Sequence, residues 1–392
     1  MFKRLLGGAA PAGSSSTWSA IASRAVGMQQ RRAFSVSQPL GVSAINFPKT
    51  SSKELDELLE KIRYDIILPS YLPALQRKRL HNRKYKAALE ADPITMEIDG
   101  EKLRFYYRDL LKEMPNTKDL LRKVVALMKT PDDWAVLPRL LEGVCVQGKR
   151  KLKKDDYSKL VRKASLAGCV HTVLTCAREV KRTNFKLDNR EVVTDLLANI
   201  QVEAVRADYS EEATNKALQR TERVMEMLED ENHQPKLKRG QTEAHIFPLY
   251  KEPIFLAARL HMAAALAVKH RGGVDEDGKV TKYAKELVTL WPENQGMSDL
   301  YKTDEHTGGK ANAERLRHPA KMLITGAPVQ NGMQLAAQVV DAELAKELRN
   351  RAQAVAKDVQ AAWAQKPLRE GSRMYEVYDK LINRELKSTA SA

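Results

Sequence analysis

The chain has 392 residues, 43% of them hydrophobic and 30% charged, with a formal net charge of +16. This length and apolar content suffice for a buried core in one or two domains and exclude a wholly unstructured chain. The longest apolar run, residues 254–268, is shorter than the roughly 20 residues that span a bilayer and contains Arg259 and His261, so we expect no transmembrane segment.

The first 53 residues contain no Asp or Glu, but they include Lys and Arg among many Ser, Ala and Gly. This composition is typical of a mitochondrial transit peptide. The stretch RRAFSVSQ (31–38) resembles a matrix-protease site with Arg two residues before an aromatic residue. It predicts cleavage after Phe34, removal of residues 1–34 and a location in the mitochondrial matrix. A basic tail without a targeting role is the alternative.

The chain stays basic after this cleavage. Removal of residues 1–34 takes away five basic and no acidic residues, which lowers the formal charge from +16 to +11. Such a balance favours polyanionic partners, such as RNA or an anionic membrane surface.

The first predicted structural segment is an extended arm over residues 35–52, which are rich in Ser and Pro. A helix is predicted over 53–68, where Leu and Ile recur at helical spacing after a Ser cap. A second helix, over about 72–90, contains the densest basic cluster of the chain. Its predicted phosphate-binding residues are Arg77, Lys78, Arg79, Arg83 and Lys84. A solvated helix face is the alternative interpretation of this cluster.

The next segments are predicted to form a train of helices. Residues 91–115 contain a possible hairpin turn at Asp99-Gly100 and then a helix that ends at Pro115. Further helices are predicted at about 117–129, 132–147, 155–167, 170–183, 189–205 and 210–231, separated by short turns. This pattern of antiparallel helix pairs indicates an α-solenoid-like array, so we assign residues 53–231 to one helical-hairpin domain.

A polar and basic linker, residues 232–243, precedes a C-terminal helical region over 244–392. Within it, helices are predicted in the apolar stretch 244–270 and at about 280–291, followed by a long polar loop. Residues 331–365 read as one long helix and 370–386 as another, so the predicted fold class is all-α.

One hairpin has a more specific pattern. Residues 154–188 span 35 positions and carry helix-packing residues in both predicted helices, a small-residue turn between them and a terminal aspartate. These residues are Tyr157, Leu160, Val161, Ala164, Ala167, Gly168, Val170, Leu174, Val180 and Asp188. In this pattern the hairpin resembles a pentatricopeptide repeat. The neighbouring segment 189–223 departs from it, with Val202-Glu203 where Ala-Gly is expected.

The resemblance implies a superhelix of stacked hairpins that reads RNA bases through the fifth and last positions of each unit. Here these positions are Ser158 and Asp188. The basic run that leads into the hairpin would neutralise phosphates. Its residues are Lys149, Arg150, Lys153 and Lys154. The alternative is that Ser158 is an ordinary helix residue and Asp188 a helix N-cap.

The remaining motifs give no sign of catalysis, a cofactor or a metal. Residues 274–286 lack two essential ligands of a calcium loop, and the Gly-Gly-Lys of 306–314 lacks the rest of a phosphate loop. The three cysteines show no CxxC spacing, which predicts reduced core thiols rather than a disulfide framework or a zinc ribbon. We therefore expect a protein that is not an enzyme.

These features together predict a non-catalytic mitochondrial matrix factor in mitochondrial gene expression. It would bind mitochondrial RNA, the mitochondrial ribosome or both, in transcript maturation or translation. The alternative is a helical scaffold for protein partners, such as a respiratory-complex assembly factor. An exposed apolar stripe would favour the scaffold, whereas gathered Arg and Lys would favour RNA.

Overall fold

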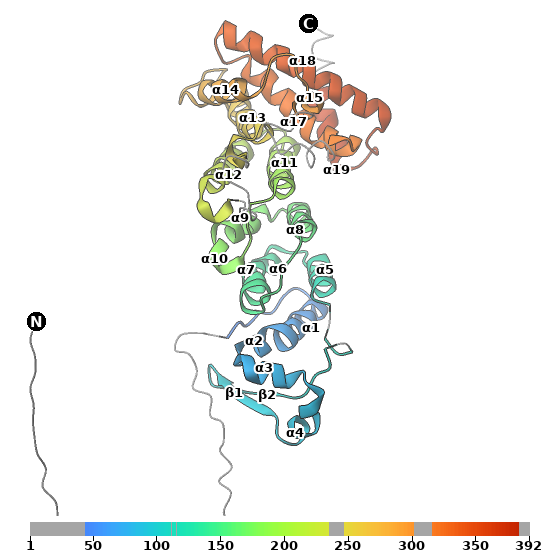
Figure 1. Ribbon diagram of the computed structural model, residues 1–392. Helices are drawn as coiled ribbons and strands as arrows, with labels where there is room; N and C mark the ends of the chain where they lie inside the picture. Colours follow the sequence, from blue (N-terminus) through green and yellow to red (C-terminus); the bar gives the residue numbers. More distant parts are fainter. Residues whose placement is uncertain (1–43, 111, 115, 235–246, 302–315, 384–392) are drawn as a thin grey trace, which may run out of the picture. The chain divides into compact units, whose positions relative to one another are not determined.

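The computed structural model describes residues 44–110, 112–114, 116–234, 247–301 and 316–383 (Figure 1). The chain divides into two units, Met1–Gly41 and Val42–Ala392. The first unit, which includes the predicted transit peptide, lies outside the described residues. Helices dominate the second unit, and its described strands form a single two-stranded sheet. The predicted all-α array is confirmed.

The first helix follows its sequence pattern. α1 (Lys53–Ile62) begins after Ser52, whose side chain accepts a hydrogen bond from the Leu55 amide. Its apolar face is buried, and the chain continues through the π-helical η1 (Arg63–Ile67) into α2 (Leu68–Tyr71). The expected helix over 53–68 is therefore present.

Asp133 anchors the preceding extended residues to the array. Its buried carboxylate accepts hydrogen bonds from the amide and the hydroxyl of Ser51, both at 2.8 Å, and from the amides of Lys129 and Thr130. Burial alone would raise the pKa of Asp133, but these hydrogen bonds lower it below its usual value. The ionised carboxylate thus ties the chain before α1 to the start of α6 (Pro131–Ala135).

The predicted helix over 72–90 is divided into three short pieces, α3 (Ala74–Leu80), η2 (Arg83–Tyr85) and α4 (Lys86–Ala91). Asn82 breaks the run, because its side chain accepts a hydrogen bond from the Lys84 amide.

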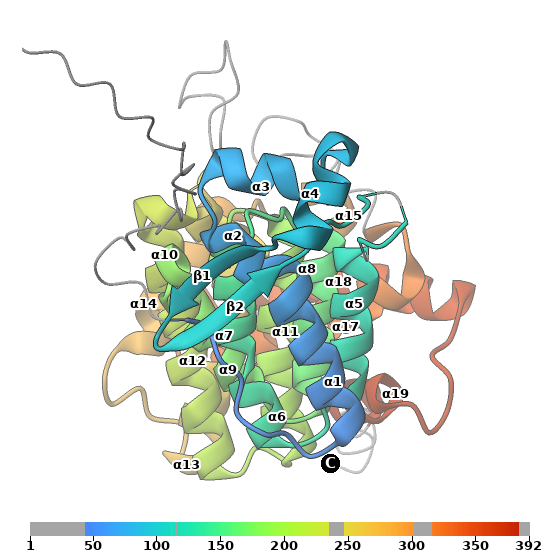
Figure 2. The ribbon, with the colours of Figure 1, turned by 90° about the horizontal axis from the view of Figure 1, so that it is seen from below.

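The predicted helix ending at Pro115 is wrong. The predicted hairpin turn at Asp99-Gly100 is present, because β1 (Ile94–Ile98) and β2 (Glu101–Phe105) form an antiparallel hairpin around these two residues, both with positive φ. Alternate residues of the hairpin, including Leu103 and Phe105, pack with Leu80 in a small core. The hairpin lies beside α2 and α3 (Figure 2). Buried and exposed side chains alternate along this short stretch with a period of two, which is the pattern of a strand and not of a helix.

Two rows of helices build the central array. The helices are α5 (Thr117–Leu127), α6, α7 (Leu137–Leu141), η3 (Glu142–Gln147), α8 (Lys154–Leu166), α9 (Val170–Arg178), α10 (Val180–Thr183), α11 (Arg190–Arg206) and α12 (Glu211–Glu229). In one row α1 packs on α5, α5 on α8, and α8 on α11. In the other, α7 packs on α9 and α9 on α12. This stacking is the pattern of a helical repeat array.

The turn between α8 and α9 explains the glycine of the repeat-like hairpin. Gly168 has a φ of 71°, and the Cys169 amide donates to the Ala164 carbonyl at 2.8 Å. This hydrogen bond closes the end of α8, and only a residue with easy access to positive φ suits the position. In the same hairpin, the ring of Tyr157 in α8 packs edge-to-face with the ring of Phe185, and the ring centres lie 5.0 Å apart.

The C-terminal helices continue the packing. They are α13 (Pro253–His270), α14 (Lys279–Leu290), α15 (Met297–Leu300), α17 (Pro319–Ala336), α18 (Ala342–Gln365), α19 (Arg373–Tyr378) and η7 (Asp379–Asn383). α13 is almost wholly buried and packs against α12, α14 and α17. Among the described helices, none combines the length and apolar character that crossing a membrane requires.

The predicted single helix over 331–365 is wrong. It is divided between α17 and α18, which pack closely on each other. The break lies at residues 337–341, where the Asp341 side chain accepts a hydrogen bond from the Leu344 amide at 2.9 Å and starts a new helix.

Candidate functional site

The predicted cations of the first cluster lie together on α3 and η2. We call Arg77, Lys78, Arg79, Arg83 and Lys84 the N-terminal basic surface. All are exposed except Arg77, which is half-buried and donates to the Ser70 carbonyl. Within the described part of the chain, no carboxylate lies within 4.0 Å of these five side chains. The surface therefore keeps its positive charge available for an anionic partner.

One aromatic ring lies against this surface, and a second lies against Lys86, the next cation along the chain. The Arg79 guanidinium carbon lies 5.6 Å from the centre of the Tyr85 ring, and Lys86 Nζ lies 5.8 Å from the centre of the Tyr107 ring. Cations interleaved with aromatic rings are the features with which proteins hold single-stranded nucleic acid, by phosphate contact and base stacking.

The second predicted set lies in and after the turn between η3 and α8. Lys149, Arg150 and Lys153 are exposed, and Lys149 has a positive φ of 51°. Lys154 is partly neutralised, because its Nζ lies 3.5 Å from Glu191 Oε2. The two predicted basic sets thus occupy different segments of the array.

The two predicted base-reading residues differ in their exposure to solvent. Ser158 is buried, with 4% of its surface exposed, and its hydroxyl has no hydrogen-bond partner among the described residues. Asp188 is exposed. The N-cap of α11 is Asn189, whose side chain accepts from the amides of Glu191 and Val192. The role of Ser158 and Asp188 in base recognition stays a prediction.

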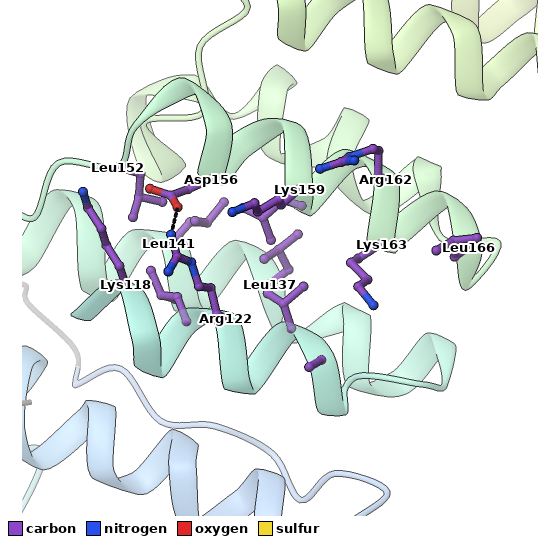
Figure 3. Close-up of a pocket in the computed structure, with 14 residues that line it drawn as sticks. Lys118, Arg122, Leu137, Leu141, Leu152, Asp156, Lys159, Arg162, Lys163 and Leu166 are labelled. Atoms are coloured by element: carbon purple, nitrogen blue, oxygen red, sulfur yellow. Dashed lines mark ion pairs between the residues drawn. The ribbon is translucent and has the colours of Figure 1, made fainter. Parts of the chain in front are cut away.

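The sequence did not reveal a groove between α5 and α8, which has a volume of about 420 Å³ (Figure 3). We call it the α5/α8 groove. Its floor is apolar and includes Leu121 and Val125 of α5, Leu137 and Leu141 of α7, and Leu160 of α8. Such a floor can bury apolar side chains of a partner.

The rim of the groove is cationic. Its charged residues are Lys118, Arg122, Asp156, Lys159, Arg162 and Lys163. Arg122 points toward Asp156, with 3.7 Å between Nη2 and Oδ1 (Figure 3). Arg122 also pairs with Asp119 at 3.3 Å. In the described ranges, no carboxylate lies within 4.0 Å of the other four cations.

A sequence signal for this rim exists. Lys118 and Arg122 are four residues apart, and Lys159, Arg162 and Lys163 follow the same helical spacing, which places each set on one helix face. The pairing of the two faces depends on the packing of α5 on α8, which the sequence pattern does not specify.

Several titratable groups of the interior are neutral and have structural roles. Burial raises the pKa of Cys145 to about 11 and lowers the pKa of His261 to about 3. Cys169 and Cys176 are also buried and unpaired. Across the described ranges there is no group of three or more His, Cys, Asp or Glu side chains that could hold a metal ion.

Comparison with known proteins assigns this arrangement to a family. The family model described as mitochondrial ribosomal protein mS27 matches residues 32–380, which include both basic sets and the α5/α8 groove. The chain is also 36% identical to the small ribosomal subunit protein mS27 of Neurospora crassa over 371 residues, which cover 90% of this chain and 93% of that protein. The chain therefore belongs to the mitochondrial ribosomal protein mS27 family.

Proposed function

We propose that the protein is a non-catalytic component of the mitochondrial small ribosomal subunit and acts in translation in the mitochondrial matrix. The match to the mS27 family over residues 32–380 carries this proposal. The nearly full-length similarity to a relative named as a small ribosomal subunit protein supports it. The basic N-terminal residues 1–34, with the RRAFS motif, supply the matrix address in this proposal.

The N-terminal basic surface is assigned to ribosomal RNA. Its five cations have no carboxylate partner in the part of the chain that the structure describes, and the Tyr85 ring lies against it. Phosphate contacts supply affinity without sequence preference, which suits a structural component of a ribonucleoprotein. Lys149, Arg150, Lys153 and Lys154 form a second phosphate-binding set in this proposal.

The hairpin α8–α9 is assigned as a pentatricopeptide-like unit of the domain 53–231. Its support is the glycine turn at Gly168 and the packing of α8 on α11, the first helix of the following hairpin. The exposed Asp188 is the residue of this unit that can reach a base, whereas Ser158 would first have to become exposed. Residues 232–243 link this domain to a helical region over 244–392 in the same proposal.

Ultraviolet crosslinking in intact mitochondria, followed by RNA sequencing, tests the assignment to RNA. The wild-type chain should crosslink to the RNA of the small subunit. The triple variant Arg79→Gln, Arg83→Gln, Lys84→Gln should lose most of this crosslinking yield. In RNA-binding titrations over a salt series, its slope of log K against log salt concentration should be smaller than that of wild type, by roughly 0.7 per lost phosphate contact. The matched control, Lys53→Gln, Lys61→Gln, Lys216→Gln, removes three exposed cations elsewhere and should behave as wild type. Equal losses in both variants would contradict a specific RNA surface.

A further inference from the structure

The α5/α8 groove combines an exposed apolar end with an apolar floor. Leu166, at the end of α8, is 64% exposed, and Ala126 of α5 is exposed beside the groove floor. Leu121 and Val125 lie one turn apart on α5 and line the same groove. A groove between two helices with this lining fits the apolar face of a third helix.

The charge of the rim defines the flanks of that helix. Five cations surround the groove, and the one carboxylate, Asp156, lies 3.7 Å from Arg122. A partner with Asp or Glu beside its apolar face would pair with Lys118, Lys159 and Lys163, whereas a basic partner would be repelled.

The chain's own remaining segments do not have this chemistry. Residues 1–43 contain no Asp or Glu, and residues 235–246 carry three Lys or Arg against one Glu. Residues 302–315 contain no Leu, Ile, Val, Met or aromatic residue, and residues 384–392 carry two cations against one Glu. The occupant is therefore sought in another molecule.

RNA is also a poor occupant of this groove. None of the residues that line it is aromatic, in contrast to the N-terminal basic surface with Tyr85. Base recognition in single strands relies on stacking, and phosphates gain nothing from a leucine and valine floor. A protein helix uses both the floor and the rim.

We propose that the α5/α8 groove binds one amphipathic helix with acidic flanks, supplied by a neighbouring protein of the small subunit. This inference deepens the proposed function and rests on it, because the neighbour is sought within that assembly. The neighbour's Leu, Ile, Val or Met side chains enter the groove at helical spacing, and its carboxylates pair with the rim.

Photo-crosslinking identifies the occupant. p-Benzoylphenylalanine is placed at Ala126, which lines the groove, or at Lys123, which is exposed on the same helix but does not line it. After irradiation, the small subunit is purified and the adducts are sequenced by mass spectrometry. The expected adduct at position 126 is one net-negative peptide with apolar residues at helical spacing, and position 123 should not yield it. RNA adducts, a peptide without acidic excess, or no adduct above the level at position 123 would overturn the inference.

Binding in solution tests the charge pairing. A fluorescent synthetic copy of the crosslinked peptide is titrated with the full mature chain. Lys159→Glu with Lys163→Glu should weaken binding about 10-fold or more, because a like-charge rim repels acidic flanks. The matched reversal Lys61→Glu with Lys123→Glu, at exposed positions outside the groove, should change it by less than about 2-fold. Equal weakening in the two double variants would contradict the pairing.

The two proposals fail differently. If RNA is the adduct at position 126 while the wild-type chain still sediments with the small subunit, the groove inference is wrong and the proposed function stands. If the wild-type chain does not sediment with the small subunit, the proposed function itself is wrong.

Discussion

Arg190 and Glu252 form a largely buried ion pair, in which Arg190 Nε donates to Glu252 Oε2 at 2.8 Å, the Arg190 side chain is 18% exposed and the Glu252 side chain has no exposed surface. The Tyr301 hydroxyl donates to Oε1 of the same carboxylate at 2.6 Å. Burial and the neighbouring Glu252 raise the pKa of Tyr301 well above its usual value, so this hydroxyl stays protonated. The pair joins the central array to the C-terminal helices.

Removal of one partner should be costly. Arg190→Met leaves the Glu252 carboxylate buried without its cation, and we expect a loss of ~3–5 kcal/mol in the free energy of unfolding. Urea unfolding of the mature chain measures this loss. Arg206→Met is the control, because its pair with Glu376 at 3.2 Å is about half exposed and should contribute ~1 kcal/mol or less. Similar losses in the two variants would contradict the structural role of the buried pair.

Acid should destabilise the fold through His261. This side chain is fully buried, with Nδ1 2.8 Å from Gln201 Oε1 and Nε2 2.8 Å from the Tyr209 hydroxyl. Burial lowers its pKa from 6.5 to about 3, so between these values the unfolded chain binds a proton that the folded chain does not. The free energy of unfolding should therefore fall as the pH is lowered through this window, by up to ~1.4 kcal/mol per pH unit from this group.

Urea unfolding at pH 7.0 and 5.0 tests this dependence. Burial also lowers the pKa of His233, which adds a loss of the same sign. The variant His261→Asn should be less stable than wild type at both pH values, but its free energy of unfolding should differ less between pH 7.0 and pH 5.0. The exposed His171→Asn should keep the wild-type difference. An unchanged difference in His261→Asn would exclude His261 as a source of the pH dependence.

The backbone conformation at position 168, rather than the space around it, should decide which residues can replace Gly168. Its φ is 71°, and a Cβ added there would meet no atom within 4 Å. Gly168→Ala should lower the free energy of unfolding by ~1–2 kcal/mol. Gly168→Asn should lower it less, because Asn adopts the left-handed backbone more readily, and Gly168→Val should lower it more, because Val is β-branched. Thermal unfolding of the three variants gives the order. If Asn, the larger residue, cost more than Ala, steric crowding would be the cause instead.

Processing of the N-terminus is a prediction on residues outside the described part of the chain. The RRAFS motif predicts a mature protein that begins at Ser35 or Val36. Arg32→Ala should slow the cleavage or shift its position, and mass spectrometry of the N-terminal peptide from purified mitochondria measures both. An intact Met1 on the mature protein would argue against a transit peptide.

Most of the successful predictions of the fold rest on apolar residues at helical spacing and on helix-capping residues. The α8–α9 hairpin was predictable because Gly168 marks a turn between two amphipathic runs, and the association with the mitochondrial ribosome is confirmed by the family. The break at residues 337–341 was missed, although Asp341 is a capping residue, because apolar spacing continues through it. The hairpin at Asp99-Gly100 was predictable from its turn residues. The helix expected after it was wrong, because local periodicity over the five residues of β2 is weak until Leu80 and the neighbouring helices cover it.

The surfaces were less predictable than the helices. The N-terminal basic surface is visible as a run of cations in the sequence, whereas the α5/α8 groove depends on how two helices pack on each other. Burial of Ser158 likewise depends on tertiary packing, because its position in the helix pattern does not say which face a neighbouring helix covers.

Sedimentation of a mitochondrial extract through a sucrose gradient tests the central proposal most directly. The tagged wild-type chain, expressed in place of the native protein, should migrate with the small ribosomal subunit and appear there at about one copy per subunit. It should move to lighter fractions when the subunit is dissociated by high salt, because the basic surfaces bind RNA electrostatically. A chain that remains at the top of the gradient at low salt, separate from the small subunit, would contradict its assignment as a ribosomal component.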